Sequence, residues 1–289
     1  MMKKVLLATD FSEPAFQLMA CLPELKNMGM EEIILFHAVS VVRAQASALE
    51  LQRYHEEKLH TEKEQLVKEG YHVKVRVPLG FPPEEILATA IQEKVDLILM
   101  GSHGGGMIKS IFLGSTTFDV IRMSTIPVLV EKYTNISRED YTPTCRLKFN
   151  RVLFPTDFSD CARHGWKYLI DVATHLDEVI IVSVMQKIRD QEMWQEIRER
   201  WEQELTMMKK EMESAGCQVQ THLTEGTPSR QILRVAEDES ASLIIMPKRG
   251  EGYIKQLLLG STAEAVTRQS SQPVLLIPCQ LPNESGGNA

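Results

Sequence analysis

The sequence predicts two tandem α/β domains, each built around a mostly parallel β-sheet with helices on both faces. The first observation is an internal repeat: Val-Leu-Leu-Ala-Thr-Asp-Phe-Ser at 5–12 returns as Val-Leu-Phe-Pro-Thr-Asp-Phe-Ser at 152–159, and Leu-Gly-Ser-Thr at 113–116 returns at 259–262. The copies are 147 residues apart at the first motif and 146 at the second, about the size of one domain. The second observation is that strand-like and helix-like segments alternate within each copy, as they do in parallel α/β sheets.

In the first copy, short apolar runs rich in β-branched residues predict five strands. They are Lys4–Ala8, Ile33–Val39, Tyr71–Val77, Val95–Met100 and Pro127–Val130. The stretches between them predict helices over Glu13–Met28, Arg43–Glu69, Pro83–Glu93 and Ser115–Ser124. The third of these helices follows a proline pair, which suits a helix start.

The second copy repeats this order. Its predicted strands are Arg151–Pro155, Val179–Val184, Gln218–Leu223, Leu243–Met246 and Pro273–Ile277. A long helix is indicated by apolar residues that recur every three or four positions: Trp194, Ile197, Trp201, Leu205, Met208 and Met212. We interpret this apolar stripe as core or interface rather than as a set of cofactor contacts.

These patterns divide the chain into four parts. We expect a first domain at 1–132, a connector at 133–148, a second domain at 149–280 and a loose polar tail at 281–289. The connector and the tail are polar and show no helical or strand periodicity.

Composition excludes several classes of function. The formal net charge of −7 argues against a broad nucleic-acid surface, which needs a basic face. No apolar run approaches the roughly 20 residues of a membrane helix, and no secretory leader is recognisable, so we expect a cytoplasmic protein without a membrane partner. The five cysteines show no metal-binding spacing and form a poor disulfide framework, and we interpret them as packing thiols.

A glycine-rich loop follows the fourth strand of the first copy. It reads Met100-Gly101-Ser102-His103-Gly104-Gly105-Gly106, and Gly114-Ser115-Thr116 comes after it. Glycines let the backbone approach a ligand closely, and the amides of the next helix start form a positive end for phosphate. The spacing is neither that of a P-loop nor that of the dinucleotide fingerprint. The loop therefore predicts a phosphate-binding crevice at the carboxyl edge of the sheet.

Asp10 ends the first strand at the same edge. Its carboxylate is placed to accept from ribose hydroxyls or an adenine amine, and the main chain around Val39 is placed to bracket the base. The alternative is structural: Thr9–Ser12 forms a turn in which Ser12 caps the following helix.

Together these residues resemble the universal stress protein family. Gly101-x-x-Gly104, then nine residues, then Gly114-Ser115 is similar to that family's nucleotide-binding signature, and Thr9–Ser12 resembles its first-strand loop. The resemblance covers nearly the whole chain as a tandem pair. It implies a Rossmann-like domain of the adenine nucleotide alpha hydrolase type, with a five-stranded parallel sheet, and pairing of the two copies through their last strands into an internal pseudo-dimer.

The resemblance also implies roles for individual residues in the first copy. Adenine and ribose would be held by Thr9, Asp10 and Val39. The ribose and phosphate side would be lined by Met100, Gly101, His103, Gly104, Gly114, Ser115 and Thr116. His103 stands at a variable position of the signature, so it is either a phosphate donor or an ordinary loop residue.

The second copy departs from the signature at one position. Pro247 replaces the first glycine; it has no amide hydrogen and fixes φ, so one phosphate donor is lost and the loop is expected to take a different path. The candidate site residues of this copy are Thr156, Asp157, Val184, Met246, Arg249, Gly250, Gly260, Ser261 and Thr262. Lys248 or Arg249 would replace the lost amide with a cation, or both are solvated loop charges. Ser261–Glu264 also reads as a capping box, which is a structural role.

We therefore expect an adenine-nucleotide-binding stress protein that acts through ligand-dependent stabilisation or assembly. The ligand would be ATP, ADP or AMP, with or without Mg²⁺, held in a competent first site and in a second site that is weaker for triphosphates or tolerant of shorter nucleotides. Whether two chains form a homodimer stays open.

Two alternatives remain. One is slow ATP hydrolysis, for which His103 is the residue to test; the Ser-Gly-Gly-x-Asp-Ser signature of ATP-cleaving ligases is not matched by residues 9–12. The other is an assembly module with vestigial sites.

Overall fold

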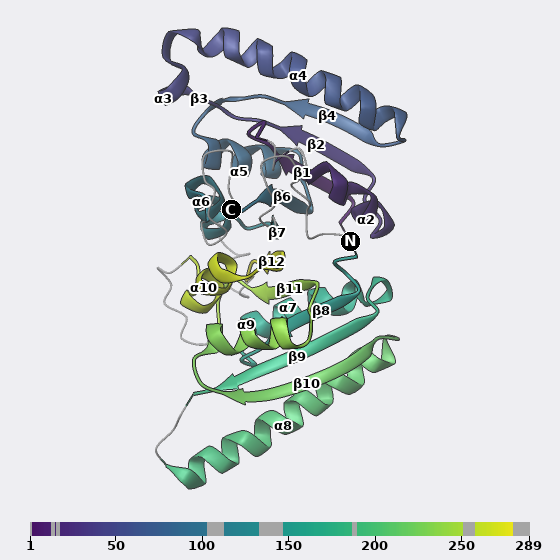
Figure 1. The fold of residues 1–289 in the computed structure, drawn as a ribbon, viewed down its shortest axis with the longest axis vertical. Helices are drawn as coiled ribbons and strands as arrows, with labels where there is room; N and C mark the ends of the chain where they lie inside the picture. Colours follow the sequence, from purple (N-terminus) through teal and green to yellow (C-terminus); the bar gives the residue numbers. More distant parts are fainter. Residues whose placement is uncertain are drawn as a thin grey trace, which may run out of the picture. The chain divides into compact units, whose positions relative to one another are not determined.

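The computed structural model describes residues 2–12, 15, 18–102, 113–132, 147–186, 190–250 and 258–279. The chain forms two compact units, residues 1–146 and 147–289 (Figure 1). The division falls inside the segment 133–148 that the sequence marks as a connector. Each unit is described by itself below.

The first unit contains a five-stranded parallel sheet with the order β7-β6-β1-β2-β4. Its strands are β1 (Lys4–Ala8), β2 (Glu32–Phe36), β4 (His72–Arg76), β6 (Leu97–Gly101) and β7 (Val128–Glu131). Two short strands, β3 (Val39–Ser40) and β5 (Leu79–Gly80), pair separately. The helical elements are η1 (Leu18–Cys21), α2 (Leu22–Asn27), α3 (Val41–Ala44), η2 (Gln45–Ser47), α4 (Ala48–Lys68), α5 (Pro82–Gln92) and α6 (Ser115–Met123).

The second unit repeats this topology with the order β12-β11-β8-β9-β10, again with all strands parallel. Its strands are β8 (Arg151–Pro155), β9 (Glu178–Met185), β10 (Gln218–Glu225), β11 (Leu243–Pro247) and β12 (Val274–Ile277). The helices are α7 (Asp160–Asp171), η3 (Ala173–His175), α8 (Gln191–Ser214), α9 (Pro228–Asp238) and α10 (Ser261–Gln269). The predicted fold class is confirmed in both units.

The central strands form the core of each unit. The side chains of Val5, Leu6 and Leu7 on β1 are fully buried, as are those of Val152, Leu153 and Phe154 on β8. Strands buried on both faces read as continuous apolar runs, which is why the runs rather than strict alternation predicted them. Strand β4 differs, since its exposed residues His72, Lys74 and Arg76 alternate with the buried Val73 and the half-buried Val75.

Strand order places the candidate sites. From β1 the chain moves to β2 and β4 on one side and later to β6 and β7 on the other. Such a reversal opens a crevice at the carboxyl ends of the two central strands. In the first unit these strands are β1 and β6, and in the second they are β8 and β11.

One prediction from the cysteines is wrong. Cys161, in the first turn of α7, and Cys279, just after β12, form a disulfide. They are 118 residues apart, so only the fold brings them together. Cys21 and Cys217 are buried and take no part in this disulfide, as predicted for packing thiols, whereas Cys145 lies outside the described residues.

The helices of the described ranges include none that is both long and apolar enough to cross a membrane.

Candidate functional site

The first unit holds a cavity of about 950 Å³ at the carboxyl ends of β1, β2 and β6. The candidate residues that line it are Thr9, Asp10, Val39, Met100, Gly101, Gly114, Ser115 and Thr116. His103 and Gly104 lie outside the described residues. Residues predicted from two separate motifs thus meet around one cavity.

Asp10 is fixed by the turn that follows β1. Its Oδ1 accepts from the Ser12 backbone N–H at 3.0 Å and from the Ser12 hydroxyl. Thr9 Oγ1 accepts from the Phe11 N–H at 3.0 Å, and Phe11 adopts a left-handed conformation with φ 60°. One carboxylate oxygen is therefore used inside the turn, and no hydrogen bond given for the described residues uses Oδ2.

At the end of β6, strand alternation determines where the Gly101 amide points. The N–H groups of Ile98 and Ser102 donate to the carbonyls of Pro127 and Glu131, both on the β7 side. Alternate residues of a strand bond to opposite neighbours, so the Gly101 N–H faces the β1 side and the crevice. The chain lies next to the end of β6 again at Gly114, whose N–H donates to Ser102 O at 2.8 Å. Helix α6 begins at the next residue, and no side chain caps its N-terminus. The first amides of α6 thus remain available at the cavity.

Two histidines, His37 and His55, also line this cavity. His37 Nδ1 is 2.9 Å from the Thr9 carbonyl, so the ring proton sits on Nδ1. His55, on α4, packs against His37 with ring centroids 4.4 Å apart, and Phe11 contacts both rings. Burial lowers the pKa of His37, and burial together with His37 and Lys58 lowers the pKa of His55 to about 4. Both rings are therefore neutral at pH 7.

Sequence analysis missed these histidines. The position of His37 in the sequence does indicate a site, because this residue directly follows β2 and so lies at the same edge of the sheet as Asp10. No sequence feature indicates His55, since it is one of many polar residues on the long helix α4.

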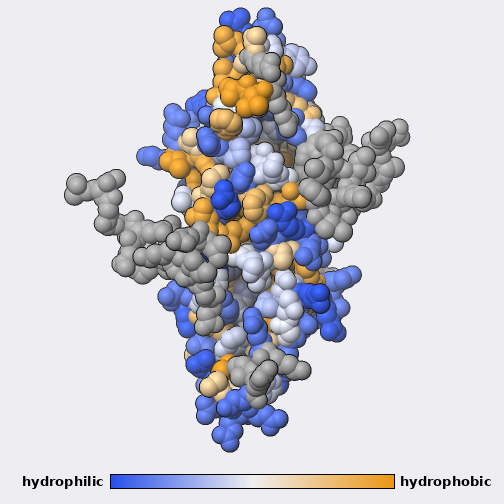
Figure 2. Space-filling view, turned by 90° about the vertical axis from the view of Figure 1, so that its left-hand side faces the viewer, coloured by the Kyte–Doolittle hydropathy of each residue, from blue (hydrophilic) through white to orange (hydrophobic). Residues whose placement is uncertain are grey.

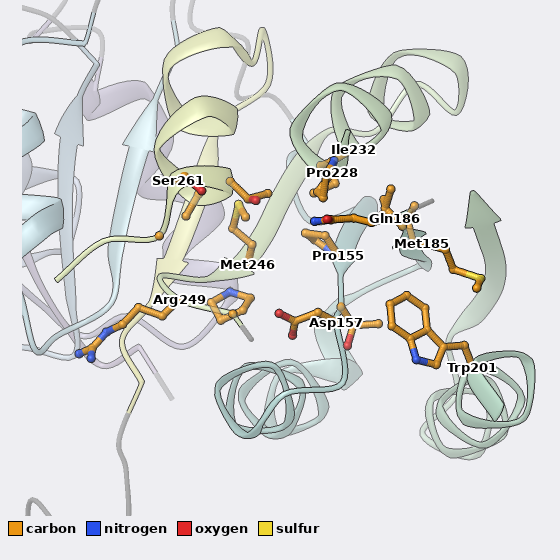
Figure 3. A pocket seen from close by; sticks show the side chains of 18 of the residues that line it. Pro155, Asp157, Met185, Gln186, Trp201, Pro228, Ile232, Met246, Arg249 and Ser261 are labelled. Atoms are coloured by element: carbon orange, nitrogen blue, oxygen red, sulfur yellow. The ribbon is translucent and has the colours of Figure 1, made fainter. Parts of the chain in front are cut away.

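The second unit holds the equivalent cavity, of about 590 Å³ (Figure 3). It is lined by all nine candidates of the second copy, namely Thr156, Asp157, Val184, Met246, Arg249, Gly250, Gly260, Ser261 and Thr262. Figure 3 shows Gln186, Met246 and Trp201 directed into the cavity, whereas the Arg249 side chain extends away from it. Of the two cations considered for the lost amide, Arg249 lines the cavity at its edge, and its side-chain charge lies away from the other labelled side chains (Figure 3).

The Asp157 turn repeats that of Asp10. Asp157 Oδ1 accepts from Ser159 N at 3.1 Å and Ser159 Oγ at 2.6 Å, and Phe158 again has φ 60°. Ser159 also caps α7 by accepting from Ala162 N at 3.3 Å. The turn and the site were posed as alternatives, but this turn caps the helix and also places Asp157 at the cavity.

The ends of the loop that follows Pro247 keep the backbone hydrogen bonds of the first unit, whereas residues 251–257 lie outside the described part of the chain, so the expected change of loop path stays a prediction. Lys248 N donates to Ile277 O at 2.9 Å and Gly260 N donates to Lys248 O at 2.8 Å, the same bonds as in the first unit. The proline fits because the amide it lacks would face the crevice, so no sheet hydrogen bond is lost. One crevice donor is nevertheless missing.

The capping-box interpretation of Ser261 is also wrong. Gly260 is the N-cap of α10, no side chain caps it, and Ser261 is the first helical residue. Glu264 instead accepts from Arg268 Nε at 3.0 Å.

Lys248 is buried, at 3% exposure, and lines the cavity. Burial, with a smaller effect of Arg249, lowers its pKa to about 8.

The two units differ chemically at the positions of His37 and His55. Ser183 takes the place of His37: its hydroxyl donates to Thr156 O at 2.8 Å, as His37 does to Thr9 O. Trp201 takes the place of His55 and packs against Phe158 with centroids 5.2 Å apart. The first cavity is thus lined by an imidazole pair, whereas the second is lined by the indole of Trp201, and Ser183 is fully buried and does not line it.

These two sites belong to recognisable domains. The model of the universal stress protein family matches residues 1–132 and 148–278. The chain belongs to the universal stress protein family. Universal stress protein MJ0577 of Methanocaldococcus jannaschii is 36% identical over 158 residues, which cover 47% of this chain and 98% of that protein. MJ0531 of the same organism is 31% identical over 139 residues, covering 45% of this chain and 82% of that protein.

The tandem arrangement also has a solved counterpart. The crystal structure of a universal stress protein from Archaeoglobus fulgidus covers 96% of this chain and 96% of its own, with a TM-score of 0.74 and 28% identity. This universal stress protein therefore shares its two-domain fold with a known structure.

Proposed function

We propose that the first unit binds an adenine nucleotide and that the bound nucleotide stabilises the folded protein as a stress-response signal. The proposal rests on one observation: Asp10, Gly101 and the N-terminus of α6, which has no side-chain cap, line the same cavity. The carboxylate would accept from ribose hydroxyls, and the amides of Gly101 and the first turn of α6 would bind phosphate. A ligand that binds only the folded state stabilises it by mass action.

The second unit would bind a nucleotide with a different preference. It keeps the Asp157 turn and the α10 start but lacks the amide at Pro247, and Arg249 points away. A hydrogen bond to a charged group contributes about 1.5–3 kcal/mol, or one to two decades in affinity. We propose that this site is weaker for ATP and favours AMP or ADP.

Mg²⁺ would enter with the phosphates rather than occupy a site of its own. The described residues contain no group of three or more side chains arranged as metal ligands.

The first experiment is to denature the freshly purified protein, identify any released nucleotide by mass spectrometry and count it per chain. About one adenine nucleotide per chain would support a single high-affinity site, and about two would mean that Pro247 is tolerated. No nucleotide, and no thermal shift with AMP, ADP or ATP, would overturn the proposal in favour of an assembly module.

Matched variants assign the sites. Asp10→Ala should abolish binding in the first unit, and Asp157→Ala, the same change in the second unit, should leave that binding intact. ATP turnover that persists through further purification and is lost in Asp10→Ala would favour slow hydrolysis over a binding function.

We also propose that β7 and β12 pair within one chain in a cytoplasmic protein. In each unit taken alone these are edge strands; β12 is apolar throughout, with the sequence Val-Leu-Leu-Ile, and β7 is apolar except for its last residue, with the sequence Val-Leu-Val-Glu. An apolar edge is a template for pairing, and pairing inside the chain would satisfy both edges. Light scattering should then give a monomer mass of 32.8 kDa at micromolar concentration, whereas a dimer that persists on dilution would mean pairing between chains.

A further inference from the structure

The disulfide of the second unit lies beside its candidate ligand site. Cys161 is in the first turn of α7, two residues after Ser159, the residue that caps this helix and bonds to Asp157. Cys279 comes two residues after the end of β12. Both cysteines are nearly buried, at 4% and 5% exposure.

The two ends of this bridge are attached to different walls of the cavity. On one side is the turn that holds Asp157. On the other side, the carbonyl of Ile277 accepts from Lys248 N, and the carbonyl of Lys248 accepts from Gly260 N, just before α10. The bridge therefore ties the Asp157 wall covalently to the wall that carries the phosphate-side residues.

The first unit builds the same walls without a bridge. By the repeat offsets, Pro14 stands at the position of Cys161 and Tyr133 at that of Cys279. The Asp10 turn and the Gly114-to-Ser102 bond form all the same. The fold does not require the bridge, so it is a feature of the second unit alone.

The other cysteines of the described residues are poor exchange partners. Cys217 Sγ donates to Ala173 O at 3.2 Å, and burial and Asp177 raise the pKa of this thiol. A thiol kept protonated reacts slowly in disulfide exchange. Cys21 is fully buried.

We propose that Cys161 and Cys279 form a thiol–disulfide switch that sets the ligand affinity of the second unit. A thiolate of a dithiol reductant attacks one sulfur, forms a mixed disulfide and expels the other as a thiolate, which takes up a proton. The second thiol of the reductant then loses its proton and displaces the first cysteine. The net reaction transfers two electrons and two protons, leaving two cysteine thiols and an oxidised reductant.

Reduction removes the link between the two walls. The start of α7 and the end of β12 then gain conformational freedom, which ligand binding has to remove. Fixing the backbone of even one residue costs about 1–2 kcal/mol, which corresponds to a roughly tenfold loss of affinity. The coupling is reciprocal, so bound ligand makes the bridge harder to reduce by the same factor. This affinity effect rests on the proposed nucleotide function; the bridge itself does not.

The first test counts thiols. After equilibration with glutathione disulfide, alkylation of the denatured protein should label three cysteines, and treatment with dithiothreitol should raise this to five, the total in the sequence. A peptide pair joined through Cys161 and Cys279 should appear only in the oxidised sample. Five labelled cysteines after oxidation would overturn the proposal.

The second test uses tryptophan fluorescence, which reports on the second unit alone because Trp166, Trp194 and Trp201 are the only tryptophans in the chain. AMP titration should give an affinity about tenfold weaker after reduction. The oxidised Cys279→Ser variant should behave like the reduced protein, while Cys217→Ser should keep the redox response. The fluorescence-detected Tm should fall by roughly 10 °C on reduction, the scale expected for opening a loop of this length.

The outcomes separate the two proposals. A measurable AMP affinity that is equal in both redox states would overturn the switch, whatever the change in Tm. If AMP causes no response in either redox state but the Tm still depends on redox state, the nucleotide function is overturned. The disulfide would then act only as a stabilising crosslink.

Discussion

The carboxylate of Asp157 lies directly against Gly250, so that a β-carbon on Gly250 would overlap Asp157 Oδ2 and stand 3.2 Å from its Cγ. The two residues come from different motifs, one following β8 and the other following β11. Their contact gives a physical reason for the second signature glycine: it leaves room for the acid of the neighbouring loop. The second unit keeps this glycine although it has lost the first.

Gly250→Ala should therefore impair the site by displacing Asp157. Because the β-carbon meets a carboxylate held by two hydrogen bonds from Ser159, the carboxylate has to leave its turn. We expect AMP affinity in the second unit to fall about tenfold, equivalent to roughly 1.4 kcal/mol, measured by tryptophan fluorescence. Gly165→Ala is the matched control, since its β-carbon would meet Phe154 at an ordinary 3.4 Å. Equal affinities for both variants would contradict the assigned role of Gly250.

Pro247→Gly should strengthen triphosphate binding in the second unit. The described backbone already follows the path of the first unit, so the substitution restores a crevice-facing amide without rebuilding the loop ends. We expect ATP affinity to rise by about one decade, with a smaller change for AMP. Calorimetric titration in an Asp10→Ala background isolates this site. An affinity no better than that of the parent would show that the missing amide is not what limits binding.

Arg249→Ala should leave binding nearly unchanged, within about twofold. The side chain extends away from the cavity, so its charge contributes only a screened, long-range attraction (Figure 3). Lys248→Ala is the informative comparison because Lys248 is buried at the cavity. A large loss in Arg249→Ala, measured by the same AMP titration, would mean that the arginine turns into the site when ligand binds.

Local patterns predicted much of this molecule. Apolar runs located the strands of both sheets, and the glycine and Thr-Asp motifs identified residues that meet at one edge. Strand ends were less certain: a single run was predicted over Ile33–Val39, but β2 ends at Phe36 and β3 begins at Val39, whose amide bonds to Pro78 O. That break depends on a distant segment, so the local pattern could not show it.

The features that sequence analysis missed are pairwise and long-range. The Cys161–Cys279 bridge and the His37–His55 contact each join residues that carry no motif of their own. Exposed side chains are another example: Figure 2 shows apolar residues on part of the surface, and the exposed apolar side chains of the first unit include Val41, Val42 and Leu49. Helical periodicity does not identify these exposed residues as a group, because they come from two helices, α3 and α4.

The histidine pair should make the first unit lose stability on mild acidification. The folded protein holds both rings at a lowered pKa, about 4 for His55 against an ordinary 6.5. Between these values the unfolded chain binds more protons, so the free energy of unfolding decreases as pH falls from about 6.5 toward 4 and levels off above 7. The groups facing the pair include Lys58, which adds repulsion to the charged rings, and Asp10, which partly offsets it. Thermal unfolding measured between pH 7 and pH 5 tests this.

Replacing the pair with the residues of the second unit supplies the decisive comparison. His37→Ser keeps a hydroxyl donor for the Thr9 carbonyl, as Ser183 does for Thr156, and His55→Trp reproduces the packing of Trp201 on Phe158. The double variant should fold and should lose most of the pH dependence of Tm between pH 7 and 5. His60→Gln, an exposed change on the same helix, should keep it. An unaltered pH profile in the double variant would assign the acid sensitivity to carboxylates elsewhere and not to this cavity.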